Sequence, residues 1–383
     1  MEKKKILFVT TRSPFSKIYS GDRKRSKIIL EYLNKKNNLH VLYSDNLNER
    51  GKTVIKNSFF KRNFFDKIKG ITTSLISLKP IQLGYFYSQD VNNFLKKNHN
   101  KYQTIIFHLI RSAQYLPKEY KGKKILEMTD LISKNYTQII KSFSILNPLM
   151  YLYFLENLLL KSYEYFCFNK FDKIVLASRN DLKNTKIKIN NKIIEIPNIV
   201  ETNKRIYKFK SKNYKIIFVG NINYFPNKKA IHDFALNILP SLNKKFPEIQ
   251  FHIVGEIKNK DKIYYNKIKN IYVHGPKKNL GPIIKNSICG ICNVNIGTGT
   301  QMKMLTYMSY GLPCISSIVS FKNTSFNPNK EIIVFNNKND LISKIIKLKK
   351  NKLFSNKISK LSYFAFKKKY EINKILSRYD KII

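Results

Sequence analysis

Three short apolar runs in the second half of the chain, residues 216–220, 249–255 and 271–275, each end in a glycine. Short runs of this kind are typical of buried strands, and a helix is expected between the first two, over 227–245. Strands that alternate with helices favour a parallel sheet with helices on both faces. Such a sheet binds ligands at the carboxyl ends of its strands, where glycine lets the backbone approach a ligand. We therefore expect an α/β fold with a ligand site along this edge.

The first half of the chain alternates in the same way. Residues 5–10 predict a first strand, and a helix is expected from Gly21 onward. Further strands are expected at 38–44, 102–109, 124–128, 173–178 and 192–197, and a long helix at 148–169. The segment 201–213 is polar and basic without an apolar period, which is typical of a linker. The sequence thus predicts two doubly wound, Rossmann-like domains, 1–200 and 214 onward, that enclose a cleft.

Polar residues follow two of the strands expected in the first half. His108 ends one strand with Arg111 just beyond it, and Asp130 follows the next. These side chains are expected where the carboxyl edge of the sheet meets a cleft. A single histidine there has two interpretations, a structural hydrogen-bonding residue or a substrate contact. Arg23 and Arg25 also have two interpretations: they are either anion contacts or solvated charges on a helix.

The stretch 297–317, GTGTQMKMLTYMSYGLPCISS, predicts a helix that follows a run of small residues and precedes a buried strand. Thr300 can cap a helix over 301–310, Gly311 can end it, and 314–317 predicts a buried strand. A helix start preceded by small residues suits a phosphate, and Lys303 lies one turn away. Lys303, Thr306, Tyr307 and Tyr310 are expected on one face, with Met304, Leu305 and Met308 in a core. The alternative is an ordinary buried helix after a glycine turn.

The net charge is +48, from 72 lysine and arginine residues against 24 acidic ones. Lysine carries most of the excess and accompanies many Asn and Ile residues, a combination that A/T-rich codons favour. Such a surface attracts anionic lipid, nucleotides or nucleic acid. The chain has no RNA-binding motif and no arginine-rich aromatic platform, so no nucleic-acid partner is expected.

The four cysteines fit a reduced compartment. Cys289 and Cys292 form a C-x-x-C pair inside an apolar run, which favours buried cysteines over a metal or redox site. No metal site and no cofactor are expected. No secretory signal precedes the first strand, and the longest uncharged apolar stretch, 142–155, is too short to span a bilayer. The segment 57–77 predicts a basic amphipathic helix, either on a membrane surface or simply solvated.

Several of these segments resemble family-four glycosyltransferases of the GT-B fold, especially those that build bacterial surface polysaccharides. The motifs in the second half are 217–227 (IFVGNINYFPN), 253–255 (IVG), 273–275 (VHG), 297–303 (GTGTQMK) and 310–313 (YGLP). Those in the first half are Ser20-Gly21, 85–88 (YFYS), 111–115 (RSAQY), Asp130 and 196–198 (IPN). They occur in the expected order, and the resemblance covers nearly the whole chain.

The resemblance implies a retaining glycosyltransferase without a bound metal. The domain at 214–361 would hold a nucleotide-sugar, the first domain would present a lipid-linked or glycan acceptor, and a final helix, 362–383, would cross back to the first domain. Its action on such acceptors implies a cytoplasmic protein at the inner face of the membrane, and the charge suits an anionic surface.

The resemblance also assigns roles to single residues. Lys303, with Gly299 and Thr300, would neutralise the departing diphosphate. The remaining positions are Gly220 and Asn221 at the sugar phosphate, Gly275 and Pro276 at the base, Gly21 at the diphosphate, His108 at the donor sugar or acceptor, and Arg111 and Asp130 at the acceptor or sugar.

Three positions depart from the family pattern. The family's paired glutamates fall on Thr298 and Thr306, and the second of these normally binds the ribose hydroxyls. Gln301 stands where an arginine is common, so one positive charge is missing beside the diphosphate. The alternatives left open are a degenerate transferase that acts as a non-catalytic partner and a nucleotide-sugar epimerase.

Overall fold

The computed structural model of the chain describes residues 3–16, 21–45, 53–141, 143–182, 185, 191–295, 301–322 and 324–383. The chain divides into two units, each with its own parallel sheet. Unit 1 comprises Met1–Pro197 together with Leu376–Ile383, and unit 2 comprises Asn198–Ile375. The segment 201–213 and residues 362–375 therefore both belong to unit 2.

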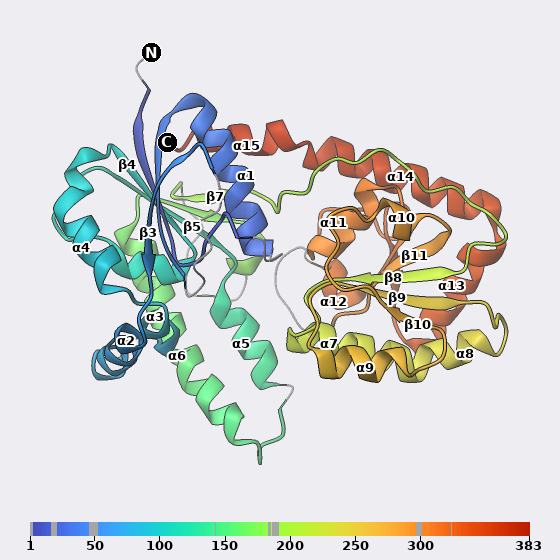
Figure 1. Ribbon diagram of the computed structural model, residues 1–383. Coiled ribbons are helices and arrows are strands. Elements are labelled where there is room, and N and C mark those ends of the chain that lie inside the picture. The colour runs from blue at the N-terminus through green and yellow to red at the C-terminus, as the bar shows by residue number, and fades with distance from the viewer. Residues whose placement is uncertain are drawn as a thin grey trace. The chain divides into compact units, whose positions relative to one another are not determined.

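The sheet of unit 1 has the strand order β3-β2-β1-β4-β5-β6-β7, and every pair in it is parallel. Its strands are β1 Lys5–Thr10, β2 Asn38–Asp45, β3 Lys56–Lys61, β4 Thr104–His108, β5 Lys123–Thr129, β6 Lys173–Leu176 and β7 Ile193–Glu195. Ile6 to Val9 of β1 are fully buried, because helices cover both faces of this central strand. The continuous apolar runs found in the sequence are typical of such strands (Figure 1).

The helices of unit 1 follow its strands in sequence (Figure 1). They are α1 Gly21–Lys36, α2 Phe64–Ile76, α3 Ile81–Tyr85, α4 Gln89–Asn98, α5 Ile132–Ile140, α6 Pro148–Lys170 and α15 Ile372–Asp380, whose last residues alone belong to this unit. The short 3-10 helices are η1 His99–Lys101, η2 Ile110–Tyr115 and η3 Arg179–Leu182. The helices α5 and α6 extend away from the sheet as a hairpin (Figure 1).

The sheet of unit 2 has the strand order β10-β9-β8-β11-β12-β13 and is also parallel. Its strands are β8 Lys215–Val219, β9 Gln250–Val254, β10 Ile271–Val273, β11 Ser287–Cys292, β12 Cys314–Ser317 and β13 Ile333–Phe335. Its helices are α7 Phe225–Asp233, α8 Leu239–Asn243, α9 Asn259–Asn266, α10 Gly281–Ile284, α11 Met302–Ser309, α12 Ile318–Phe321, α13 Lys338–Lys350 and α14 Lys352–Tyr370. Two doubly wound, Rossmann-like sheets are thus present, as the alternation predicted.

One expectation for secondary structure was wrong, and one expected helix is present but irregular. The segment 57–77 is not one amphipathic helix, since β3 occupies Lys56–Lys61 and α2 begins only at Phe64. The helix expected over 227–245 is α7 and α8 joined by a π-helical turn, Phe234–Ile238, just before Pro240. Proline lacks the amide that a regular helix needs, and this interrupts the hydrogen-bond ladder.

The segment 201–213 packs against unit 2. The amide of Ile206 donates to the carbonyl oxygen of Tyr310 at 3.1 Å. The hydroxyl of Tyr363 donates to the carbonyl oxygen of Asn203, also at 3.1 Å. Tyr207 is buried. The polar composition of this segment therefore does not make it a free linker.

Candidate functional site

Three glycines lie side by side at the carboxyl ends of β8, β9 and β10, and we call them the glycine edge: Gly220, Gly255 and Gly275. The amide of Gly220 donates to Val254 and that of Gly255 to Gly275, both at 3.0 Å. A Cβ atom on Gly255 would lie 1.8 Å from the carbonyl oxygen of Gly220, so only glycine fits there. Pro276, which follows the glycine edge, is exposed.

Helix α11 begins beside this edge. Its N-cap residue is Gln301, so the expected cap at Thr300 was wrong. The side chain of Gln301 makes no capping hydrogen bond. Thr298, Gly299 and Thr300, expected at the diphosphate, lie outside the described residues. The helix ends as expected, with Gly311 at φ +70°.

Lys303 is buried at the start of α11, with 6% of its surface exposed. Its ammonium donates to Asn227 Oδ1 at 2.9 Å and to Gln301 Oε1 at 3.4 Å, and it lies 4.8 Å from the ring centre of Phe218. No carboxylate pairs with it among the described residues. Burial lowers its pKa, since charge is costly away from water. A buried cation held by neutral amides is suited to an anionic ligand.

Asn227 connects Lys303 to the loop after β8. Its Nδ2 donates to the carbonyl oxygen of Asn221 at 2.8 Å, while its Oδ1 accepts from Lys303. A Cβ atom on Gly220 would lie 3.0 Å from Asn227 Nδ2 and 3.5 Å from Lys303 Cε. The structure thus brings Gly220, Asn221 and Lys303 together. Sequence reasoning assigned no role to Asn227, although this residue ends the quoted motif 217–227.

The expected face of α11 is divided between the core and the site. Tyr307 is fully buried; its hydroxyl accepts from the amide of Val219 at 2.8 Å and donates to the carbonyl of Ile291 at 3.2 Å. Tyr307 therefore fixes α11 to β8 and β11. Thr306 is half-buried, and its hydroxyl donates to Met302 within the helix at 3.0 Å. The expected core residues, Met304, Leu305 and Met308, are buried.

In unit 1, two non-glycine residues at the carboxyl edge have left-handed backbone angles. Leu109, after β4, has φ 65°, and Thr129, at the end of β5, has φ 67°. This conformation is strained for a leucine or a threonine and often marks a functional site. His108 and Asp130 stand next to these residues. Gly21, the first residue of α1, is exposed.

His108 is buried and stacks on Phe8, with ring centres 5.5 Å apart. Burial lowers the pKa of His108, and this effect outweighs the carboxylates of Glu127 and Asp22, which raise it. Neither ring nitrogen makes a hydrogen bond to the part of the chain that the structure describes. A neutral histidine with unused ring nitrogens can accept a hydrogen bond from a ligand at one nitrogen and donate one to it from the other.

Arg25 and Glu127 form a buried ion pair beneath this edge, with Arg25 Nε 3.0 Å from Glu127 Oε1. The other guanidinium nitrogens donate to the carbonyls of Ile196 and Pro197, and the Tyr379 hydroxyl donates to Glu127. The sequence allowed two interpretations of Arg25, an anion contact or a solvated charge, and both were wrong. Burial and Glu127 raise the pKa of Asp130 to about 6, while Arg25 opposes the rise.

Arg23 also departs from both interpretations, because it is paired with Asp45 at 3.0 Å. Arg111 lies in η2, where its Nε donates to Gln82 Oε1 at 3.0 Å and its guanidinium lies 4.2 Å from the ring centre of Phe86. Arg111 therefore belongs to the same carboxyl edge as His108.

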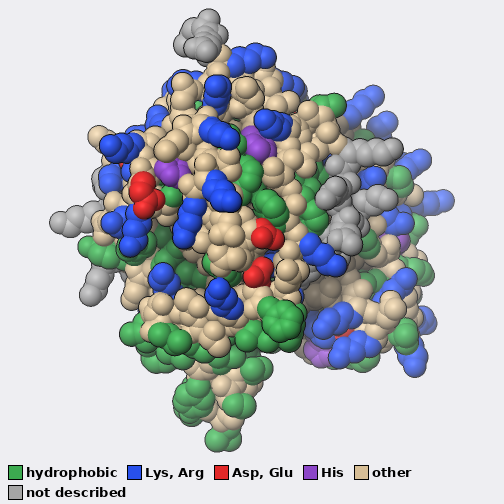
Figure 2. All heavy atoms as spheres, turned by 60° about the vertical axis from the view of Figure 1, so that its left-hand side comes forward, with side chains coloured by type: hydrophobic (Ala, Val, Ile, Leu, Met, Phe, Trp, Pro, Cys, Tyr) green, Lys and Arg blue, Asp and Glu red, His purple; other side chains and the backbone are tan. Residues whose placement is uncertain are grey.

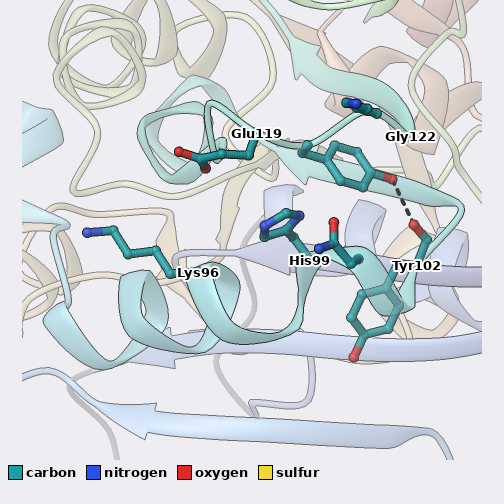
Figure 3. A pocket seen from close by; sticks show the side chains of 8 residues that line it. Lys96, His99, Tyr102, Glu119 and Gly122 are labelled. Carbon is teal, nitrogen blue, oxygen red and sulfur yellow. Dashed lines mark hydrogen bonds between the residues drawn. The ribbon is translucent and has the colours of Figure 1, made fainter.

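Another pocket lies elsewhere in unit 1. It has a volume of about 850 Å³ and is lined by Lys96, His99, Tyr102, Glu119 and neighbours (Figure 3). Tyr102 and Gly122 just precede β4 and β5, so this pocket is at the amino ends of the strands, opposite His108 and Asp130. Ligands of parallel sheets bind at the other edge, and we do not place the site here.

Comparisons with known proteins agree with this geometry. Residues 213–351, which contain the glycine edge and α11, match the family "Glycosyl transferases group 1". No curated protein sequence matches the chain. Among solved structures, the chain is similar to sucrose-phosphate synthase from Thermosynechococcus elongatus, with 13% identity, TM-score 0.72, and coverage of 99% of this chain and 98% of that chain.

Two other structures are similar over nearly their full length. Anabaena Alr3699/HepE in complex with UDP and glucose has 10% identity, TM-score 0.69, and coverage of 99% and 98%. WaaG, a glycosyltransferase involved in lipopolysaccharide biosynthesis, has 11% identity, TM-score 0.68, and coverage of 98% and 99%. The likeness to TarM is partial, since 76% of this chain spans 57% of that one, with 16% identity and TM-score 0.58. Residues 213–351 thus match a group 1 glycosyl transferase domain, and each unit of the chain has the Rossmann-like sheet of the GT-B fold.

Proposed function

We propose that the protein transfers a sugar from a nucleotide-sugar to a lipid-linked or polysaccharide acceptor, with retention and without a metal or cofactor. The observation that carries this proposal is Lys303, a buried lysine without a carboxylate partner among the described residues, beside the glycine edge. A nucleoside diphosphate is a leaving group that needs positive charge, and Lys303 supplies it. The likeness to HepE bound to UDP and glucose supports a nucleotide-sugar donor.

In this reaction the bond between the anomeric carbon and the diphosphate oxygen breaks. An acceptor hydroxyl forms the new bond on the same face of the sugar, and its proton passes to the departing diphosphate. Lys303 stabilises the charge that develops on the diphosphate, and Asn227 holds the ammonium in place. We assign the sugar and acceptor contacts to His108, Arg111 and Asp130.

A membrane-surface location belongs to the same proposal. No helix in the described ranges is both long and apolar enough to span a bilayer. Large hydrophobic side chains are nevertheless exposed on α2 and on the α5–α6 hairpin, and we call them the apolar face: Phe64, Phe65, Ile68, Leu75, Ile76, Ile145, Leu146, Leu149, Tyr151, Leu152, Phe154, Leu155 and Leu158. Figure 2 shows hydrophobic side chains gathered around this projecting part of unit 1.

The charges around the apolar face favour an anionic lipid surface as its occupant. Both acidic residues of α6, Glu156 and Glu164, are buried, whereas Lys141, Lys161 and Lys69 are exposed. Apolar side chains surrounded by lysines bind anionic bilayers by combining burial with charge attraction. The likeness to WaaG, involved in lipopolysaccharide biosynthesis, supports a cell-surface glycan product.

The decisive experiment incubates the purified chain with a panel of labelled nucleotide-sugars and a membrane extract. We expect one donor to release its nucleotide and transfer label to lipid or polysaccharide. If a folded chain binds no nucleotide-sugar, the proposal is wrong, and a non-catalytic partner remains. Conversion of the donor to its epimer, without an acceptor, would identify an epimerase.

A further inference from the structure

A further cavity of unit 1, which we call the α6 pocket, lies along the carboxyl-terminal half of α6. It has a volume of about 750 Å³, which is within the usual range for small-molecule sites. Its lining residues come from the loop after α2, from η2 and the loop that follows it, from β5 and from α6. No residue that we assign to the donor or the acceptor lines this pocket, so it is separate from the site described above.

The wall of the α6 pocket is largely hydrocarbon. Its apolar side chains include Leu116, Pro117, Leu159, Phe166 and Phe171. Two polar groups of the wall already have partners within the chain. Gln114 Nε2 donates to the carbonyl oxygen of Leu83 at 2.9 Å, and the hydroxyl of Tyr120 donates to the carbonyl oxygen of Tyr102 at 3.2 Å. This wall is therefore better suited to a hydrocarbon chain than to a sugar, whose hydroxyls need hydrogen-bond partners.

Four lysines also line the pocket, each from a different segment: Lys79, Lys118, Lys124 and Lys170. No acidic residue belongs to the lining, and none of these lysines forms an ion pair within the described ranges of the chain. The neighbouring carboxylate of Asp172 accepts from the backbone amide of Lys124, at 2.8 Å. Because a lysine lays its stem on apolar surface and keeps its ammonium in water, the mouth of the pocket is positively charged.

Leu78 stands at the rim of the α6 pocket in a backbone conformation that glycine usually adopts. Its φ is 50°, directly after Ser77, the cap residue of α2. The amide of Leu78 donates to Leu75 at 3.2 Å and that of Lys79 to Ser74 at 2.8 Å, which is the Schellman pattern of a helix end. A leucine is strained in this conformation, and the side chain of Leu78 is 77% exposed, so packing offsets little of the strain. Strain of this kind is expected where a side chain contacts a ligand.

The α6 pocket continues the apolar face. On α6, Leu158 belongs to that face and the next residue, Leu159, lines the pocket. On the other side, Ile76 belongs to the face and Leu78 follows it closely in the chain. A lipid at the apolar face thus has a path along apolar side chains into the pocket. Apolar walls beneath a positive mouth complement one hydrocarbon chain with an anionic head group.

We propose that the α6 pocket binds one hydrocarbon chain of an anionic lipid, with Leu78 over the chain and Lys79, Lys118 and Lys170 at the head group. The lipid is then a bound ligand of unit 1, beyond the general attraction of the apolar face to a membrane surface. This proposal rests on the proposed function only in taking the lipid from a membrane. Binding of a lipid monomer needs no vesicle, donor or turnover, so the two proposals fail separately.

The test titrates single-chain lipids into the full chain by calorimetry, below the concentration at which they form micelles. Lysophosphatidylglycerol is the anionic probe, lysophosphatidylcholine with the same lauroyl chain is the uncharged control, and glycerol phosphate is the head group without a chain. We expect the first to bind at least tenfold more tightly than the second, and the third not to bind. The decanoyl form of the anionic probe should bind several-fold more weakly than the lauroyl form, since each buried methylene contributes about fourfold in affinity.

Two variants test the residues. Leu78→Gly relieves the strained backbone, so it should melt no lower than the native chain, yet it should bind lysophosphatidylglycerol about tenfold more weakly. Its matched control is Leu353→Ala, which removes a leucine that is 84% exposed in unit 2. Lys79→Gln combined with Lys118→Gln should weaken the anionic probe about tenfold and lysophosphatidylcholine much less. Lys97→Gln, at an exposed position on α4 outside the pocket, is the control for charge.

Three outcomes would overturn the proposal. The first is equal binding of lysophosphatidylglycerol by Leu78→Gly and Leu353→Ala, or no binding by the native chain. The second is equal affinity for the two lauroyl lipids, which removes the anionic head group. The third is equal affinity for the lauroyl and decanoyl forms, which removes the buried chain. None of these outcomes bears on nucleotide release or on flotation with vesicles, which test the proposed function.

Discussion

The ammonium of Lys303 lies 2.9 Å from the amide oxygen of Asn227, and both side chains are buried. The other end of that amide donates to the carbonyl of Asn221 in the loop after β8. One asparagine therefore fixes the distance between the charge on α11 and the glycine edge. Preorganisation of this kind removes the cost of orienting a charge during the reaction.

Replacing Lys303 with alanine should abolish turnover and leave folding nearly unchanged. Loss of one preorganised charge at a leaving group lowers kcat by on the order of a hundredfold or more. The measurement is nucleotide release from the donor found in the panel, with the thermal transition recorded alongside. Lys262→Ala, at an exposed position on α9, is the control. Activity retained in Lys303→Ala with a normal melting curve would refute the phosphate role.

Replacing Thr306 with glutamate tests the ribose contact. In the native chain the Thr306 hydroxyl is already used within the helix, as a donor to Met302 at 3.0 Å. A glutamate there reaches further, and its carboxylate should strengthen donor binding by about 1–3 kcal/mol through the ribose hydroxyls. Calorimetric titration with the donor measures this. Thr306→Gln should gain less, and an unchanged affinity in Thr306→Glu would place the ribose elsewhere.

The sequence predicted the strands well because each carries a continuous apolar run. The end of β8 was predicted within one residue, and β12 lies where 314–317 placed it. The strand β3 was missed because Lys56–Lys61 is an edge strand with exposed and half-buried residues, so no apolar run marks it. The carboxyl edges were predicted, yet the partners of Lys303 and Arg25 depend on packing between segments far apart in the chain.

The buried cluster of Arg25 and Glu127 should be a large contributor to stability. Arg25→Met leaves Glu127 without its counter-charge, and breaking a buried pair costs about 3–5 kcal/mol. Tyr379→Phe, which removes one hydrogen bond to Glu127, should cost about 1 kcal/mol. Urea unfolding curves measure both changes. The control is Tyr32→Phe, which removes an exposed bond to Asp380 on the same final helix and should have almost no effect.

Glu164 should make stability depend on pH near neutrality. Burial raises its pKa to about 7, although it accepts from the amide and hydroxyl of Ser133 on α5. Between its ordinary value and about 7, the unfolded chain loses this proton while the folded chain keeps it. The free energy of unfolding therefore falls as pH rises through this window, by no more than about 3 kcal/mol, and levels off above it.

The variant Glu164→Gln isolates this effect, because an amide of the same shape does not titrate. The difference in unfolding free energy between the variant and the native chain should change across the window, while the contribution of Asp130 cancels. Urea unfolding at a series of pH values from 4 to 8 measures the difference. A constant difference would show that Glu164 is not protonated in the folded chain.

The tip of the α5–α6 hairpin should carry much of the membrane binding. Ile145 and Leu146 are 74% and 91% exposed, and burying such a side chain in an apolar medium contributes about 1.5–3 kcal/mol. Changing both to serine should therefore weaken binding to phosphatidylglycerol vesicles more than tenfold in a flotation assay. Added salt should weaken the binding of the native chain by less than these substitutions do. Leu353→Ser is the matched control, since Leu353 is 84% exposed but lies on α14 of unit 2. An equal loss of vesicle binding in the control would reject a lipid surface as the occupant of the apolar face. The same conclusion would follow if the native chain dimerised through the hairpin and did not bind vesicles.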